Sequence, residues 1–256
     1  MGAGTGGLPV KLQDKIIVVT GGTQGIGAAL CARFAREGAK AVIAADIKAA
    51  GDVVRCDVSR EADIVRLIDG TEEKFGPIDL FCSNAGIAVL DPDWDNPASA
   101  PDGGWAKSWA VNVMAHVWAA RHLVPRMSAR GGGYFLNTVS AAGLLSQIGS
   151  GAYSATKHAA LGFAENLAIN TRDRGIKVSV LCPQGVDTPM LAGITRGVPD
   201  GDGVLTAEAV ADITVEGLGA ERFLILPHPE VATYIRRKAG DHDRWLGGMA
   251  RLRRGM

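Results

Sequence analysis

The segment Thr20-Gly21-Gly22-Thr23-Gln24-Gly25-Ile26-Gly27 decides the fold, because it joins two apolar segments through a glycine-rich turn. Residues 15–20 before it read as a short buried strand, and residues 28–36 after it have the apolar spacing of an amphipathic helix. Glycine allows the tight turn, and the missing side chains let a pyrophosphate reach the amino end of the helix. Because the segment has no Walker-type lysine, it suits a dinucleotide better than a nucleoside triphosphate.

Beyond this turn, strand-like and helix-like segments alternate along the chain. Strict alternation predicts an α/β fold, here a single Rossmann-type doubly wound domain with a parallel sheet of about seven strands and helices on both faces. Ligands bind such sheets outside the carboxyl ends of the strands, so we expect the loops at residues 91–104 and 193–203 to border a site. The expected strands are residues 15–20, 41–46, 53–56, 78–83, 134–138, 177–181 and 223–226, and the expected helices are residues 28–36, 62–75, 105–127, 152–172 and 230–238.

Length and charge limit the possible architectures and partners. The 256 residues fit one domain, and we expect a flexible segment over residues 1–13, then a domain over residues 14–256 with a helical tail from about 229. The 27 basic and 27 acidic residues give a net charge of zero, so we expect a small-molecule partner and neither nucleic acid nor an anionic membrane. The amino terminus lacks a signal-peptide pattern and no run reaches membrane-spanning length, which predicts a cytoplasmic protein.

The cysteines and histidines give no support to a metal site. Cys31, Cys56, Cys82 and Cys182 are far apart and form no C-x-x-C pair, so we interpret them as reduced core thiols rather than zinc ligands or disulfides. The five histidines form no motif with cysteines or carboxylates, which also argues against a serine-type triad. We expect each histidine at the surface or on a helix.

Asp46 closes the second expected strand 19 residues after Gly27. This is near the ~20-residue offset at which an acidic side chain meets the adenosine ribose of a dinucleotide. A carboxylate there repels a 2′-phosphate, and Gln24 stands where a basic residue would hold that phosphate, so NAD is favoured over NADP. Two alternatives remain: Asp46 as a solvated strand end, and an NADP-dependent protein in which Lys48 or another nearby base binds the phosphate.

Tyr153 and Lys157 are four residues apart in a helical segment, so both side chains project from one face. A free phenol titrates near ~10, so acid or base chemistry near neutrality requires a fall of about three pKa units, or roughly 4 kcal/mol. We expect Lys157 and the oxidised nicotinamide to supply that fall. Ser140 ends the fifth expected strand, where its hydroxyl can bond a substrate oxygen that gains or loses charge.

The motifs T-G-x-x-x-G-x-G, Asn84-Ala85-Gly86 and Tyr153-Ser-Ala-Thr-Lys157 resemble those of the short-chain dehydrogenase/reductase family over roughly residues 14 to 226. The resemblance implies hydride transfer between NAD and a secondary alcohol or ketone. It also implies a homo-oligomer, with a tetramer favoured. The implied catalytic residues are Asn112, Ser140, Tyr153 and Lys157, with Asn112 anchoring a water that links Lys157 to solvent. Two rival hypotheses are an NADP-dependent carbonyl reductase and an NAD-binding scaffold that keeps the fold without turnover.

The same resemblance assigns cofactor contacts along the carboxyl edge of the sheet. Each assignment rests on a position in this sequence that matches a family motif. The implied cofactor-binding residues are Gly21, Thr23, Gln24, Gly25, Ile26 and Gly27 at the turn, Asp46, Ile47, Asp57 and Val58 at the adenosine, Asn84, Ala85 and Gly86 at the middle, Tyr153 and Lys157 beside the reacting ring, and Pro183, Gly185, Val186 and Thr188 near the carboxamide.

Two segments depart from the family pattern. In Pro183-Gln184-Gly185-Val186-Asp187-Thr188 the glycine is displaced by one position, and Gln184 either offers its amide to a substrate oxygen or turns toward neighbouring loops. The chain also ends differently, with Phe223-Leu224-Ile225-Leu226-Pro227-His228-Pro229, a helix-like segment, and an arginine-rich tail that we interpret as solvated and partly disordered rather than a patch for an anionic partner.

The loops expected to border the substrate are largely apolar, which predicts a hydrophobic secondary alcohol or ketone. We interpret the three tryptophans Trp105, Trp109 and Trp118 as packing or subunit contacts. The apolar loop residues are Val89, Leu90, Trp94, Leu144, Leu145, Ile148, Met190 and Leu191.

Overall fold

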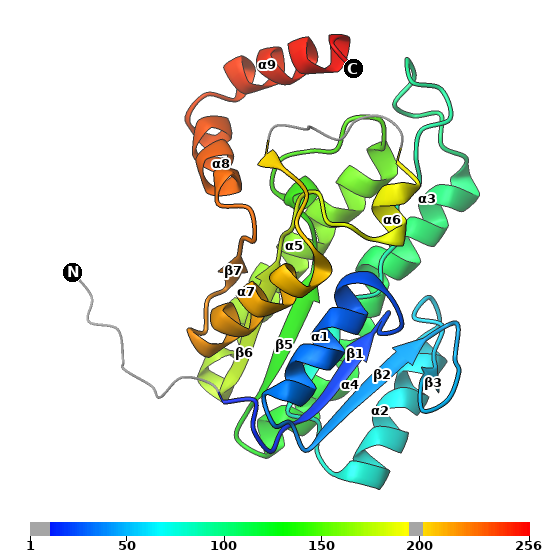
Figure 1. Ribbon diagram of the computed structural model, residues 1–256, viewed down its shortest axis with the longest axis vertical. Coiled ribbons are helices and arrows are strands. Elements are labelled where there is room, and N and C mark those ends of the chain that lie inside the picture. Colours follow the sequence, from blue (N-terminus) through cyan, green and yellow to red (C-terminus); the bar gives the residue numbers. More distant parts are fainter. Residues whose placement is uncertain (1–10, 195–201) are drawn as a thin grey trace, which may run out of the picture.

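The computed structural model describes residues 11–194 and 202–256, so part of the loop at 193–203 and most of the amino-terminal segment lie outside the described residues. The described strands form one parallel seven-stranded sheet in the order β3-β2-β1-β4-β5-β6-β7, which confirms the expected fold (Figure 1). The strands are β1 (Ile16–Thr20), β2 (Ala41–Asp46), β3 (Val54–Arg55), β4 (Leu80–Ser83), β5 (Gly133–Thr138), β6 (Ile176–Leu181) and β7 (Leu224–Ile225).

The helices alternate with the strands along the chain. The main helices are α1 (Gly25–Arg36), α2 (Glu61–Phe75), α3 (Asp102–Trp109), α4 (Ala115–Ala129), α5 (Gly151–Thr171), α6 (Pro189–Ala192), α7 (Ala207–Gly219), α8 (Glu230–Gly240) and α9 (His242–Arg254), with a π-helical turn η1 (Ala110–Met114) and the 3₁₀ turns η2 (Ala141–Gly143) and η3 (Arg172–Arg174). None of the helices in the described ranges is long and apolar enough to cross a membrane.

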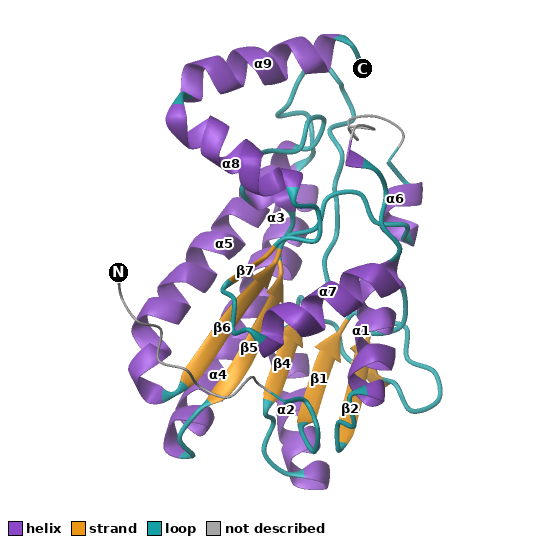
Figure 2. Cartoon of the chain, turned by 60° about the vertical axis from the view of Figure 1, so that its left-hand side comes forward, coloured by secondary structure: helices purple, strands orange, loops and turns teal. Residues whose placement is uncertain are grey.

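The sheet is buried on both faces because its strands are apolar on both sides. In β1, Ile16 and Val18 join the core under α2, α4 and α5, whereas Ile17 and Val19 join the core under α1 and α7. Side chains alternate between faces along a strand, so this five-residue strand serves both cores. Figures 1 and 2 show the resulting three layers, with helices on each side of the sheet.

The sheet order reverses between β1 and β4, because successive strands are added outward from β1 in one direction and then from β4 in the other. Helices on opposite faces leave a crevice at such a switch point, outside the carboxyl ends of the strands. The glycine-rich turn follows β1 and the Asn84 segment follows β4, so both border this crevice.

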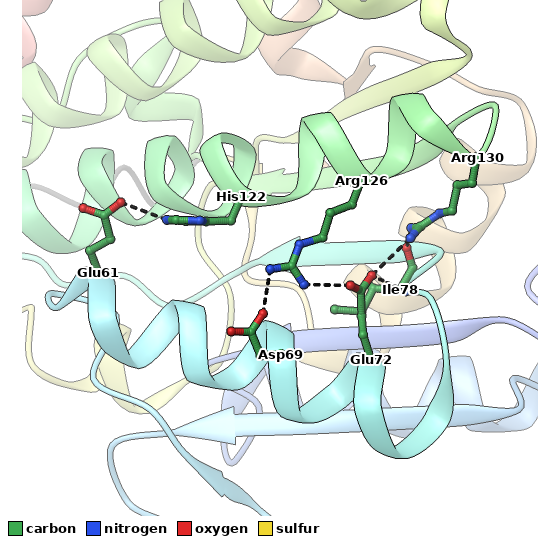
Figure 3. A network of polar contacts seen from close by, with 7 residues as sticks. All are labelled: Glu61, Asp69, Glu72, Ile78, His122, Arg126 and Arg130. Carbon is green, nitrogen blue, oxygen red and sulfur yellow. Dashed lines mark hydrogen bonds and ion pairs between the residues drawn. The ribbon is translucent and has the colours of Figure 1, made fainter.

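A network of charged side chains joins α2 to α4 on the outside of one helical layer (Figure 3). Arg126 donates to Asp69 at 2.6 Å and to Glu72 at 2.8 Å, and Arg130 donates to Glu72 at 3.1 Å. At the other end of the pair, His122 lies 2.9 Å from Glu61. Together these contacts fix the register between the two helices.

Two sequence-based expectations need correction. The helix expected at 105–127 is divided into α3, η1 and α4, because the backbone takes one wide turn around Asn112. The arginine-rich tail, which was expected to be partly disordered, forms the helices α8 and α9 up to Arg254. Arg244 donates its backbone N–H to the Asp241 side chain, which caps α9, and Arg253 bonds a distant loop. Figure 2 shows α8 and α9 beyond the carboxyl ends of the strands.

Candidate active site

One cavity of about 890 Å³ follows the carboxyl edge of the sheet. Its volume lies within the range of ligand sites that hold a cofactor or a drug-sized molecule. One end is bordered by the loops after β1, β2 and β3, and the other by residues of α6, α8 and α9. We call these the cofactor end and the substrate end.

The glycine-rich turn forms the cofactor end with its backbone. Gly21 has a φ of +65°, and a Cβ on this residue would lie 2.9 Å from the Cα of Ala85. At Gly27 a Cβ would lie 2.0 Å from the carbonyl oxygen of Gly21, so any side chain would force the turn apart. Gln24 precedes α1 in extended conformation and its side chain does not cap the helix, which leaves the first amides of α1 facing the cavity.

Asp46 and Asp57 lie at the far side of this end. The Asp46 carboxylate accepts a hydrogen bond of 2.7 Å from the Thr23 hydroxyl and one of 3.1 Å from the Lys48 backbone. Asp57 accepts from the Ser59 hydroxyl at 2.7 Å. Strand pairing brings Asp46 opposite Arg55, so β2 and β3 end together at the cavity. The structure therefore joins Asp46 to the glycine-rich turn through Thr23, and Asp57 lines the same cavity.

The side chain of Asn84 hydrogen-bonds to the ends of two neighbouring strands. Its amide donates to the Thr20 carbonyl at 3.1 Å, and its oxygen accepts from the Thr138 hydroxyl at 3.0 Å. These bonds join the ends of β1, β4 and β5. Together with Ala85 and Gly86, Asn84 also lines the cavity.

Asn112 lies in the π-helical turn and is fully buried. Its oxygen accepts from the Ile87 backbone at 3.0 Å, while its amide donates to the Ile87 carbonyl at 2.9 Å and to the Thr156 hydroxyl at 3.1 Å. Every polar atom of the side chain is thus used to join the β4 loop to α5. Single π turns are frequent at functional sites, where they alter the path of the backbone.

Lys157 lies behind Tyr153, as the four-residue spacing predicted. Its ammonium donates to the Thr138 carbonyl at 3.1 Å and lies 5.5 Å from the centre of the Tyr153 ring. Burial lowers the pKa of Lys157 to about 8. At Gly86, a Cβ would lie 3.3 Å from the lysine nitrogen and 3.4 Å from the Asn112 oxygen, so this glycine leaves space where the two residues approach.

The phenol of Tyr153 faces the cavity beside Ser140. Burial raises the pKa of Tyr153, and a hydrogen bond with Ser140 offsets part of that rise. The Ser140 oxygen accepts from the Ala142 backbone at 3.1 Å, which orients the hydroxyl. The expected fall in the tyrosine pKa is therefore absent from the protein alone, because burial outweighs the nearby polar groups.

The two departures from the family pattern meet in space. The backbone N–H of Gln184 donates to Nδ1 of His228 at 3.2 Å, although the two residues are 44 positions apart. The Gln184 side chain lines the cavity, and its buried oxygen has no hydrogen-bond partner within the described residues. Further along this segment, Val186 is buried and Thr188 caps α6.

Several lining residues escaped the sequence analysis. The expected apolar residues Leu90, Leu145, Ile148, Met190 and Leu191 do line the cavity, whereas Val89, Trp94 and Leu144 do not. The missed lining residues on α8 and α9 are Tyr234, Arg237, Trp245, Met249 and Leu252. The only signal in the sequence that could have identified them is the spacing of three and four residues between Trp245, Met249 and Leu252, which is typical of one face of a helix.

His116 is a helix residue, as expected, but it is buried rather than at the surface. Neither ring nitrogen has a hydrogen-bond partner within the described part of the chain. Burial, followed by the charge of Lys157, lowers the pKa of His116 to about 3. The four cysteines are free thiols, and no cluster of metal-ligating side chains occurs among residues 11–194 and 202–256.

Comparisons with known proteins agree with this geometry. Residues 15–198 match the family described as short chain dehydrogenase. The chain is 38% identical over 251 residues to 1-deoxy-11-beta-hydroxypentalenate dehydrogenase of Streptomyces exfoliatus, covering 91% of this chain and 90% of that protein. It is 32% identical over 236 residues to epidermal retinol dehydrogenase 2 of Mus musculus, covering 85% and 75%.

A solved structure is similar over nearly the whole chain. It is a short chain dehydrogenase/reductase from Burkholderia phymatum in complex with NAD. The TM-score is 0.80 at 29% sequence identity, covering 91% of this chain and 96% of that one.

Proposed function

Because this chain belongs to the short-chain dehydrogenase/reductase family, whose relatives are oxidoreductases of hydroxyl or keto groups, we propose that it transfers hydride between NAD and an apolar secondary alcohol or ketone. The observation that carries the proposal is the convergence of Ser140, Tyr153 and Lys157 on one cavity with the glycine-rich turn. A scaffold without turnover would have no need to bury Lys157 behind a phenol.

The residues at the cofactor end fit a dinucleotide. The side-chain-free surfaces of Gly21 and Gly27 leave room for a pyrophosphate against the uncapped amino end of α1. In this proposal Asp46 holds the adenosine ribose, while Val186 and Thr188 border the carboxamide. The bound nicotinamide would supply the hydride acceptor or donor, which no side chain can provide.

Proton transfer falls to the side chains around Tyr153. In alcohol oxidation Tyr153 removes the hydroxyl proton, and Ser140 donates a hydrogen bond to the substrate oxygen. Lys157 favours the phenolate through its charge and returns the proton toward solvent past Asn112. Because Tyr153 has a raised pKa in the protein alone, we expect the phenolate to become accessible only when a positively charged ring occupies the cavity.

The substrate class follows from the lining of the substrate end. Leu145, Ile148, Met190 and Leu191 line the same cavity as Tyr153, so a carbon-rich alcohol fits better than a sugar. The names of two relatives agree, since hydroxypentalenate and retinol are carbon-rich alcohols.

The decisive experiment is to measure NADH formation at 340 nm with a panel of alicyclic and small secondary alcohols. We expect turnover with NAD and faster turnover of the alicyclic alcohols. A purified, folded protein that binds NAD but oxidises none of the alcohols and reduces none of the matching ketones would support the scaffold instead.

A specific observation favours NADP as the second candidate. A smaller cavity beside Asp57 is lined by Arg55, Arg60 and Arg66. Arg60 and Arg66 face Asp63 at 3.8 Å and 2.7 Å, whereas Arg55 has no ion pair within the described residues. We favour NAD because the Asp46 carboxylate lies between the turn and this cavity. Dissociation constants for the two cofactors separate the candidates, and equal values or tighter NADP binding would refute our choice.

We further propose a homotetramer, on the basis of the family resemblance. Trp109 on α3 is 48% exposed, which is unusual for so large an apolar side chain and suits a subunit contact. Light scattering that gives the mass of one chain would contradict this. A cytoplasmic location stays a prediction from the sequence.

A further inference from the structure

Helix α9 presents an apolar face to the cavity although none of its side chains is fully buried in the fold. Trp245, Met249 and Leu252 are spaced by four and three residues, so they lie on one side of the helix. All three line the substrate end of the cavity. Trp245 also packs against the small apolar cluster of Ala141, Leu145 and Val231, so this face covers both that cluster and the cavity.

The helix pair is anchored at its α8 end to the loop that follows Ser140. Lys238 donates to the Leu144 carbonyl at 2.8 Å and to the Leu145 carbonyl at 2.9 Å. Val231 of α8 packs with Ala141 and Leu145 in a small apolar cluster of its own. The Tyr234 and Trp245 rings lie 6.2 Å apart, which continues this contact into α9.

The other end of α9 is fixed to a different loop. Arg253 donates to the Trp94 carbonyl at 2.6 Å and to the Asp95 carboxylate at 2.8 Å. Its guanidinium also lies 5.4 Å from the centre of a Trp94 ring, within range of a cation–π contact. Trp94 and Asp95 belong to the loop between β4 and α3, whereas the Lys238 contacts belong to the loop after β5.

Helices α8 and α9 together thus bridge two loops that border the same cavity, with Lys238 of α8 bonded to one loop and Arg253 of α9 bonded to the other. Arg253 follows Trp245 by eight positions, which corresponds to about 12 Å along a helix at about 1.5 Å per residue. Charged and aromatic contacts hold the ends, and the stretch between them carries the apolar side chains that line the cavity. Figure 1 shows α9 as the outermost helix at the end of the molecule where these loops lie.

We propose that α9 is the substrate-selecting roof of the cavity and that the Arg253 contacts with Trp94 and Asp95 hold it in place. The occupant beneath the roof is an alicyclic, carbon-rich secondary alcohol or ketone, which is large enough to reach Trp245 while its oxygen is beside Tyr153. A small alcohol reacts without touching the roof. The chemistry of the occupant rests on the proposed function, but its enclosure by α9 does not.

The test compares Arg253→Ala and Trp245→Ala with Arg254→Ala as the matched control. Arg254 is the next residue on the same helix, is exposed, and makes no side-chain hydrogen bond or ion pair within the described residues. Binding of 2-decalone is measured by calorimetry, and turnover is measured with NAD and either 2-decalol or 2-propanol. Circular dichroism and thermal melting check that each variant is folded.

We expect Arg253→Ala and Trp245→Ala to weaken 2-decalone binding about tenfold, with a similar loss in kcat/KM for 2-decalol. Arg254→Ala should change both values less than about twofold and should leave 2-propanol turnover near wild type, whereas in Arg253→Ala and Trp245→Ala the loss of 2-propanol turnover should be smaller than the loss of 2-decalol turnover. Equal 2-decalone affinity in the four proteins, or no binding to the wild type, would overturn the proposal. If 2-decalone binding depends on Arg253 and Trp245 but no alcohol is oxidised, the proposed role of α9 is supported and the proposed reaction is refuted.

Discussion

The two ends of the cavity are built in different ways. The cofactor end is made of strand ends and a turn whose shape depends on missing side chains, with a Cβ at Gly27 only 2.0 Å from a carbonyl oxygen. The substrate end is made of side chains on α6, α8 and α9, and the α8–α9 pair is held by two loops and a small apolar cluster rather than by the cores on the two faces of the sheet. The shape of the cofactor end therefore depends mainly on the backbone, whereas the shape of the substrate end depends mainly on side chains.

Because of this difference, we expect the residues that catalyse the reaction to be distinct from those that select the alcohol. Lys157 and Asn112 lie between the two ends and are fully buried, so their positions depend on the packing of the whole domain. Trp245 and Leu252 can change without disturbing the sheet, because neither is part of the cores on its two faces. We expect changes at the cofactor end to alter NAD binding, and changes at the substrate end to alter which alcohol reacts.

The largest effect is expected at Tyr153, where the two ends meet. Tyr153→Phe should lower turnover by ~10² or more while the dissociation constant for NAD stays the same, because a general acid/base is lost and the ring remains. Steady-state kinetics and cofactor titration measure the two values. Tyr134→Phe is the matched control, since its hydroxyl bonds Ser179 away from the cavity. Near-normal turnover of Tyr153→Phe would show that another group transfers the proton.

The next effect concerns the buried His116 and the pH dependence of protein stability. Burial lowers the pKa of His116 to about 3, below the ~6.5 of an unfolded chain, so the unfolded state binds the extra proton first. Stability is therefore lost as the pH falls below about 6.5, by about 2 kcal/mol between pH 7 and pH 5. Urea unfolding of His116→Gln should lack this part of the wild-type pH dependence.

The control for that measurement is His242→Gln, which removes an exposed histidine at the start of α9. It should keep the pH dependence of the wild type. If His116→Gln and the wild type lose the same free energy of unfolding over this range, His116 is not held neutral by the fold.

A smaller effect is expected at the cofactor end. Asp46→Ala should weaken NAD binding about tenfold, or about 1.4 kcal/mol, because the ribose contact and the bond to Thr23 are both lost. NADP binding should stay level or improve, since a repelling charge is gone, and turnover at saturating NAD should change little. Asp52→Ala, in the same loop, should leave both affinities unchanged. Lost turnover with unchanged NAD affinity would mean that Asp46 does not hold the ribose.

The smallest effect is expected far from both ends, in the network between α2 and α4 shown in Figure 3. Arg126→Ala removes contacts with Asp69 and Glu72 at a partly exposed position, so it should cost about 1 kcal/mol or less of stability. NAD affinity and turnover should not change. Arg36→Ala, an exposed cation on α1, is the control for loss of charge alone. A large loss of activity would show that the contacts between α2 and α4 determine the position of Asn112.

Much of the fold was predictable because its signals are local. Each sheet strand in the described ranges was expected within two residues of its observed ends, since apolar runs and glycine turns depend on neighbouring positions. The division of the long helix at Asn112 was not predictable, because a π turn leaves no pattern in the side-chain types. The burial of His116 was missed for a similar reason, since a histidine on a helix is compatible with either environment.

By itself the sequence determined the order of the elements, the glycine-rich turn, the Tyr153–Lys157 pair and the balance of charge, because each is written in residues that are close in the chain. Only the tertiary structure decided that His228 bonds the backbone of Gln184, that Asn112 joins the β4 loop to α5, and that Arg253 reaches Trp94 from 159 positions away. The physical reason is that a long side chain can bond any donor or acceptor that packing brings near. The partner is therefore chosen by the path of the backbone rather than by the residue itself.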